Sequence, residues 1–216
     1  MLILTLTAFA SAAEPDWDSL ASTDGWKDLG TRSSDVGDVE VRSKYVDDVG
    51  CVEGRTVVSA SPDSLVAVTR DMVSSIDWST AAVALSEEVE RTDADHFVLF
   101  QYYDSPGWTF SSDRYWVIRG VSAADEEGGS YRWQRVDAQT VFPAAHAKAM
   151  ARSSGAVEPP TNYGEWQFEP TEQGTSVTYR ACADIGGRVP GSIVQWLNTS
   201  QVPNLVADLV QEAERR

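Results

Sequence analysis

The sequence has few of the side chains that most often carry out chemistry. Its 216 residues include only two histidines, His96 and His146, and two cysteines, Cys51 and Cys182. Two histidines cannot form a three-histidine zinc site. No Ser-His-Asp or Cys-His arrangement, metal-ligand spacing or phosphate-binding loop is present. We therefore expect no catalytic residues, no metal site and no cofactor.

Basic residues are also scarce. The 17 Lys and Arg residues are outnumbered by 33 Asp and Glu residues, which gives a formal net charge of −16. A field of this sign repels nucleic-acid phosphates and anionic lipid headgroups. We therefore expect no nucleic-acid partner and no more than transient contact with a membrane.

Internal repeats, low-complexity tracts and linkers are absent. A chain of 216 residues without such features fits one domain. Its hydrophobic fraction of 42% suits a substantial buried interior. We expect this domain to be a monomer.

The N-terminus carries an apolar run that no Lys or Arg precedes. The run covers residues 2–10 and is followed by the small residues Ala10, Ser11, Ala12 and Ala13. It is too short to span a bilayer, but a short apolar run before small residues is typical of a signal peptide. We predict a signal peptide over residues 1–13, a folded domain over residues 14–216, and a secreted or periplasmic protein. The alternative is a buried N-terminal strand.

The hydrophobic pattern predicts an α+β fold with a strongly curved antiparallel sheet. Helices are expected over residues 16–29 and 63–72, the second capped by Ser61 with Pro62 at its first position. A long amphipathic helix ends the chain, with Pro203 as a kink or restart. Residues 139–162 form the least regular region. Strands are expected over residues 39–46, 52–60, 82–91, 96–103, 110–122 and 130–137, and two more, joined by a tight turn, precede the last helix.

The end of the chain carries an ordered set of motifs. Gly164-x-Trp166-x-Phe168-x-Pro170 is followed by Thr175-x-Val177-Thr178-Tyr179, then by Gly186-Gly187 and Val189-Pro190. In this order the motifs resemble the START family of steroidogenic-acute-regulatory-related lipid transfer domains, over roughly residues 17–214. The resemblance implies a helix-grip fold, in which a curved antiparallel sheet wraps around a long C-terminal helix and encloses a hydrophobic cavity.

A second element of the resemblance lies in residues 113–119. START domains typically show Arg-Asp-aromatic with a further Arg four residues after the aromatic; here the order is Asp113-Arg114-Tyr115, with Arg119 in place. Alternation puts Tyr115, Val117 and Arg119 on one face, and the resemblance implies that this face points into the cavity. Arg119 would then need a partner, because a lone buried guanidinium is strongly unfavourable. In the other register Arg114 faces inward and Arg119 is solvated.

Glu87 is the candidate partner for this arginine. It shares its parity with the apolar residues Val83, Leu85 and Val89, so alternation places it on the inward face. The alternative is a glutamate at a bulge near the strand end.

Aromatic residues on the alternating strands are candidates for the cavity wall. Tyrosine hydroxyls in an apolar wall need a partner, so tyrosines are the stronger candidates for contact with a polar ligand head. Ordinary core packing is the alternative for each of them. The predicted wall residues are Tyr103, Trp133, Trp166, Phe168 and Tyr179 on strands and Trp196 on the last helix.

The cysteines leave two alternatives open. An exported protein with an even number of cysteines favours a disulfide. The START resemblance, however, implies that the first strand lies between the strands of Cys51 and Cys182. Two strand spacings span roughly 9–10 Å, beyond the roughly 7 Å that a disulfide bridges between Cα atoms. Distortion near a strand end would still allow the bond.

The leading functional hypothesis is a binding protein for a lipid or sterol-like ligand. A cyclase- or hydratase-type enzyme on the same architecture is an alternative that would need Asp or Glu, Tyr and His converging in the cavity. A domain with a filled core, used for interaction, is a third hypothesis.

Overall fold

The computed structural model describes residues 14–105, 112–184 and 191–216, with the side chains of the last range from residue 200 on. The predicted signal peptide and the Gly186-Gly187 and Val189-Pro190 motifs lie outside these residues. The described part has no helix long and apolar enough to cross a membrane.

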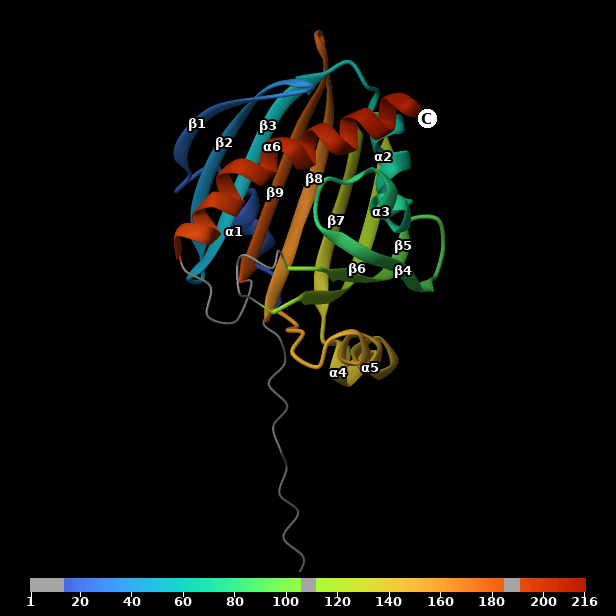
Figure 1. Ribbon diagram of the computed structural model, residues 1–216. Coiled ribbons are helices and arrows are strands. Elements are labelled where there is room, and N and C mark those ends of the chain that lie inside the picture. Colours follow the sequence, from blue (N-terminus) through green and yellow to red (C-terminus); the bar gives the residue numbers. More distant parts are fainter. Residues whose placement is uncertain (1–13, 106–111, 185–190) are drawn as a thin grey trace, which may run out of the picture.

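A single curved antiparallel sheet forms the body of the molecule (Figure 1). Its nine strands are ordered β1-β2-β3-β9-β8-β7-β6-β5-β4. From one edge, β1, β2 and β3 lie side by side in chain order, and from the other edge β4 to β9 do the same. The two runs meet where β3 pairs with β9. The strands are β1 (Lys27–Ser34), β2 (Gly37–Val46), β3 (Val49–Val58), β4 (Val83–Arg91), β5 (His96–Tyr103), β6 (Arg114–Asp125), β7 (Gly128–Val136), β8 (Thr161–Thr171) and β9 (Gly174–Asp184).

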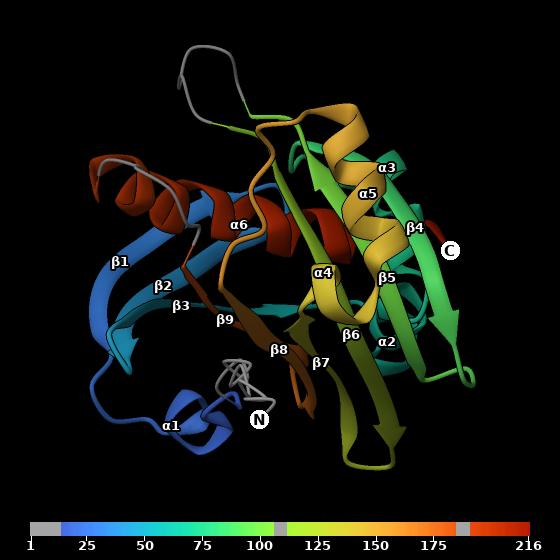
Figure 2. The same cartoon turned by 90° about the horizontal axis from the view of Figure 1, so that it is seen from below.

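Helices cover both faces of this sheet. The long α6 (Gly191–Arg215) crosses the concave face and contacts α2 (Pro62–Thr69) and α3 (Ser75–Trp78) on the same side. On the opposite, outer face lie α1 (Trp17–Ala21), α4 (Ala138–Val141) and α5 (Pro143–Arg152) (Figure 2). The expected helix-grip fold is therefore confirmed.

Two expected segments differ from the structure. The helix expected over residues 16–29 ends at Ala21, because Ser22 has a ψ of 137° outside the helical range. Gly25, with a φ of 78°, lies in the turn that leads into β1. The region without regular pattern, residues 139–162, contains most of α4 and all of α5. Pro143 does not break α5, because it occupies the start of the helix, where its missing N–H has no role.

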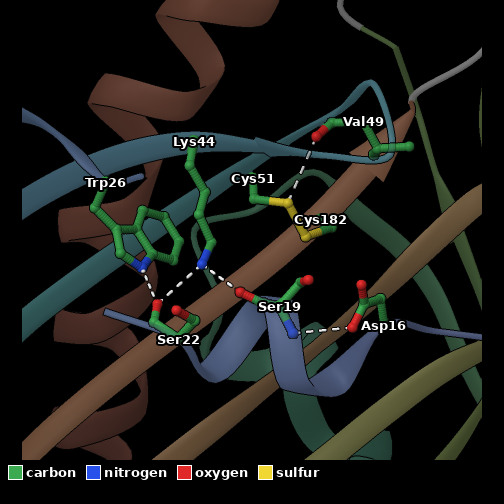
Figure 3. Close-up of a disulfide and its surroundings, with 8 residues drawn as sticks. All are labelled: Asp16, Ser19, Ser22, Trp26, Lys44, Val49, Cys51 and Cys182. Atoms are coloured by element: carbon green, nitrogen blue, oxygen red, sulfur yellow. Dashed lines mark hydrogen bonds between the residues drawn. A yellow bond between two sulfur atoms is a disulfide. The ribbon is translucent and has the colours of Figure 1, made fainter. Parts of the chain in front are cut away.

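Cys51 and Cys182 form a disulfide, with their Cα atoms 4.1 Å apart. The strand order that the resemblance implied is wrong, because β3 pairs directly with β9 and the two cysteines are direct partners in that pairing. The bridge packs against Leu20 of α1. Figure 3 shows it beside this helix, where the Lys44 ammonium donates hydrogen bonds to the carbonyl oxygens of Ser19 and Ser22.

A row of alternating charges runs across the outer face of five adjacent strands. Arg42, Glu53, Arg180, Glu165 and Arg132 are successive partners in the pairings of β2, β3, β9, β8 and β7. Arg180 Nε lies 2.8 Å from Glu53 Oε2, and a terminal nitrogen of Arg180 lies 2.7 Å from Glu165 Oε1. All three of these side chains are buried. Each buried charge therefore has an opposite charge on the neighbouring strand.

We predict that Arg180→Ala lowers the free energy of unfolding by about 3–5 kcal/mol, because it leaves two buried carboxylates without their shared partner. Lys148→Ala is the control, since it removes an exposed ion pair with Glu87 and should cost no more than about 1 kcal/mol. Urea unfolding of both variants measures the difference. Equal effects would show that the row of charges is not a stabilising feature.

Candidate functional site

A cavity of about 240 Å³ lies between the concave face of the sheet and the helices α3 and α6. Leu205 and Leu209 of α6 and Met72 beside α3 close it on the helix side. Its volume is just below the roughly 300–1,000 Å³ of pockets for drug-sized ligands, which suits a compact or single-chain ligand. Its aromatic lining residues are Trp78, Tyr103, Trp116, Tyr131, Trp133, Trp166 and Tyr179.

The aromatic wall follows from the register of the central strands. Tyr131, Trp166 and Tyr179 are successive partners on β7, β8 and β9. The rings of Trp166 and Tyr179 are 4.6 Å apart between centroids, and Trp133 stacks between Tyr131 at 5.7 Å and Tyr179 at 5.8 Å. Because alternate residues of a strand share a face, these rings form one continuous apolar surface.

No charged side chain is among the described residues that line the cavity. The polar groups there are neutral, and several of them are paired with one another. Gln101 donates through Nε2 to the Ser75 hydroxyl at 3.2 Å, and its Oε1 accepts a hydrogen bond from the Tyr103 hydroxyl at 3.0 Å. The Trp133 indole donates to Asn162 Oδ1 at 2.9 Å.

Burial raises the pKa of the hydroxyls of Tyr103, Tyr131 and Tyr179 above the ordinary tyrosine value. These three side chains therefore stay protonated and neutral at physiological pH. They can donate or accept a hydrogen bond, but none can act as an anionic base under those conditions.

The Trp116 indole is a buried group of the wall. Its Nε1 is buried and has no hydrogen-bond partner in the described part of the chain. The ring of Tyr103 packs against Trp116 at 5.0 Å in a perpendicular arrangement. A buried, unpaired donor beside a cavity is unusual.

Four of the predicted wall residues line the cavity, namely Tyr103, Trp133, Trp166 and Tyr179. Their contact with a ligand stays a prediction. Phe168 also lies on the concave face, but it is fully buried in the core instead of lining the cavity. The side chain of Trp196 lies outside the described residues.

The expected inward orientation of Tyr115, Val117 and Arg119 is wrong. Arg119 is exposed, and Tyr115 and Val117 pack on the outer face in the cluster that includes α4 and α5. The Tyr115 hydroxyl lies 2.7 Å from Nδ1 of His146. The other face of β6 points inward and brings Trp116 and Ile118 to the cavity. The alternative register, with Arg114 buried and Arg119 solvated, is the observed one.

The expected pair of Glu87 with Arg119 does not form. Glu87 lies at the surface and pairs with Lys148 of α5. Its strand shifts register between Val83 and Leu85 and again between Glu88 and Glu90. These irregularities break the simple alternation on which the inward orientation of Glu87 depended.

Several wall residues were not among the predicted ones, including Gln101, Trp116 and Tyr131. Tyr131 was recognisable, because it shares the parity of Trp133 two residues later on β7. Gln101 shares the parity of Tyr103 in the same way. Trp116 had no usable signal, because both faces of β6 are apolar.

An aspartate of α6 holds the α3 side of the cavity in place. Asp208 is buried, and its Oδ2 accepts hydrogen bonds from the Thr80 amide at 2.6 Å, the Thr80 hydroxyl at 2.9 Å and the Ser79 hydroxyl at 3.3 Å. Ser79 lines the cavity. The carboxylate thus fixes the segment after α3 against α6.

Among the described residues, no group of three or more His, Cys, Asp or Glu side chains could hold a metal ion.

Comparison with known proteins identifies relatives by structure alone. No family model matches the chain, and no curated protein matches it. The STAR-related lipid transfer protein of Xanthomonas axonopodis superposes with a TM-score of 0.69 at 22% identity, over 88% of this chain and 99% of that one. Human StAR-related lipid transfer protein 5 superposes with a TM-score of 0.70 at 17% identity, over 92% of this chain and 90% of that one.

A structure of another functional class shares the fold more distantly. The di-domain ARO/CYC protein StfQ of the steffimycin biosynthetic pathway gives a TM-score of 0.52 at 13% identity, over 76% of this chain and 49% of that one. The chain therefore has a START-like helix-grip fold, and its activity must be argued from the cavity.

We predict that Asp208→Ala lowers the free energy of unfolding by about 1–3 kcal/mol, because it leaves the Thr80 amide without its acceptor. Hydrogen exchange at the Thr80 amide should accelerate at the same time. Asp77→Ala is the control, since Asp77 is an exposed acid of α3 and should change stability by no more than about 0.5 kcal/mol. Unchanged exchange at Thr80 in Asp208→Ala would contradict the role of this contact.

Proposed function

We propose that this START-like domain binds a lipid, a sterol-like molecule or another apolar ligand in the cavity beneath α6, and that it transfers the ligand. The observation that carries the proposal is the wall of the cavity, which is aromatic and, among the described residues, uncharged. The lipid transfer proteins that share the fold add support.

Binding would be driven by removal of apolar ligand surface from water, worth roughly 25 cal/mol per Å² before the costs of association. The aromatic rings supply a large apolar contact area on rigid strands, so little side-chain freedom is lost on binding. Exchange of the ligand would require α6 or the loops beside it to move. The Asp208 contact is one that such a movement would break.

A cyclase- or hydratase-type activity is the alternative from another class. It would need an acid and a base that converge on the substrate. The described lining residues contain no carboxylate and no imidazole, and the cavity tyrosines stay neutral. These features favour binding over catalysis.

We further propose that the protein is exported and acts as a monomer outside the cytoplasm. The apolar run before residues 10–13 supports export. The Cys51–Cys182 disulfide supports it independently, because disulfides persist in oxidising compartments. The net charge of −16 disfavours docking on anionic membranes, so a neutral surface or a partner protein would deliver the ligand.

Intact mass measurement of the protein recovered from its producing cells tests export. We expect a mass that lacks residues 1–13 and no thiol that reacts with an alkylating reagent in the unfolded, unreduced protein. Reduction should then expose both cysteines. Recovery of the full-length chain in a cytoplasmic fraction with two free thiols would contradict the export proposal.

Native mass spectrometry tests ligand binding. We expect the purified protein to carry, or to take up from a lipid extract, a molecule in the lipid mass range that is lost on unfolding. Leu205→Trp fills the cavity from α6 and should reduce the loaded fraction by about tenfold or more, since cores and pockets tolerate added bulk poorly.

Val141→Trp is the matched control, because it places the same bulk on α4, where Val141 is 51% exposed on the outer side. Its loaded fraction should equal that of the wild type. A wild-type protein that remains without ligand in a lipid extract would contradict the proposed function.

A further inference from the structure

We infer that Gly120 of β6 sets the size of the ligand that the cavity accepts, because it leaves room on the sheet for the ring of Tyr131. Gly120 itself is not among the described residues that line the cavity. The inference rests on the proposed function and adds to it a positioning residue for ligand size.

Gly120 lies on the inner face of β6, between aromatic neighbours. It shares the parity of Trp116 and Ile118, which both line the cavity. Its direct partners are Phe97 on β5 and Trp133 on β7. Residues paired in this way stand side by side on one face of a sheet, so the space above Gly120 is bordered by rings.

The ring of Tyr131 occupies the space in which a side chain of residue 120 would stand. A Cβ atom added to Gly120 would lie 2.7 Å from both Cε2 and Oη of Tyr131, and 2.8 Å from Cε2 of Phe97. Non-bonded carbon atoms pack at roughly 3.5–4.0 Å, so a larger residue would have to displace a ring. Tyr131 thus leans from β7 over β6 because residue 120 has no side chain.

A displaced Tyr131 ring would move toward the cavity. On β5 the ring of Phe97 stacks on Tyr131 at 5.8 Å between centroids, is buried, and is covered in turn by the Arg91 guanidinium at 4.8 Å. A close-packed interior offers few voids, whereas Tyr131 borders the cavity directly. The cavity is therefore the space into which this ring can shift.

The position of the Tyr131 ring should then decide which ligand fits best. A methyl group at residue 120 would have to push the ring by roughly 1 Å to restore ordinary contact distances. The cavity would become shorter on that side. Because burial of one methylene group tightens binding about fourfold, a small shift of the ring should change the chain length that binds best.

Five alcohols of increasing chain length test this inference. Octanol, decanol, dodecanol, tetradecanol and hexadecanol are offered to the protein as an equimolar mixture, and native mass spectrometry gives the length profile of the bound molecules. We expect the wild type to retain one length best. Gly120→Ala should lower the ratio of that length to the next shorter alcohol by about fourfold or more.

Gly129→Ala is the matched control. It adds the same methyl group to the same face of the sheet, where the Cβ atom would lie 2.3 Å from Cγ2 of Val66. Val66 is not among the described residues that line the cavity. This variant should lose stability through overpacking and keep the length profile of the wild type.

Tyr131→Leu shows whether the ring is the group that limits the ligand. Removal of the ring should raise the ratio of the next longer alcohol to the length that the wild type retains best by about fourfold or more. Gly120→Ala combined with Tyr131→Leu should differ from Tyr131→Leu alone by less than about twofold, because no ring is left to displace. Tyr131→Leu also decides the matter if Gly120→Ala does not fold.

An unchanged profile in folded Gly120→Ala, an equal shift in Gly129→Ala, or an unchanged profile in Tyr131→Leu would overturn the inference. If the wild type retains none of the five alcohols, the proposed function itself fails.

Discussion

The register of β7, β8 and β9 in the middle of the sheet is the constraint on which both of its faces depend. On the outer face it aligns Arg132, Glu165 and Arg180 as direct partners. One residue away along each of these three strands, it aligns Tyr131, Trp166 and Tyr179 on the concave face. A slip of one residue would exchange the two rows, because strand side chains alternate between faces. Charges would then enter the cavity wall, and the same pairing that stabilises the sheet therefore also keeps the cavity uncharged.

The cavity exists because α6 approaches the sheet unevenly. At β3, Gly54 leaves room for the helix, since a Cβ there would lie 2.5 Å from a methyl group of Val202. Toward β6, β7 and β8, the tall rings of Trp116, Trp133 and Trp166 stand between the sheet and the helix. Leu205 and Leu209 close the space above them without filling it. Close contact with β3 on one side of α6 and aromatic spacers toward β6, β7 and β8 thus leave a space between the layers.

The sequence predicts most of the sheet but not the face that β6 turns to the cavity. β5 was predicted with its observed bounds, His96–Tyr103, because its apolar run is bounded by clear turns. On β6 both faces are buried, the inner one by α6 and the outer one by α4 and α5. The consecutive residues Tyr115 and Trp116 are therefore both aromatic and buried, and alternation alone could not show which of them faces the cavity. The helix α5 was not predicted, because its segment contains Pro143 and has no regular hydrophobic pattern. In the structure Pro143 stands at the start of the helix and does not interrupt it.

The charged groups of this molecule are kept apart from its cavity. The acidic excess of the chain lies with its solvent-facing residues, and the buried charges of the central strands are paired on the outer face. The described cavity wall has only neutral hydrogen-bonding groups. Changes of charge at the outer face and at the surface would therefore leave the described cavity wall uncharged. That independence follows from the two-residue period of the strands, which puts Arg180 and Tyr179 next to each other in the chain but on opposite sides of the sheet.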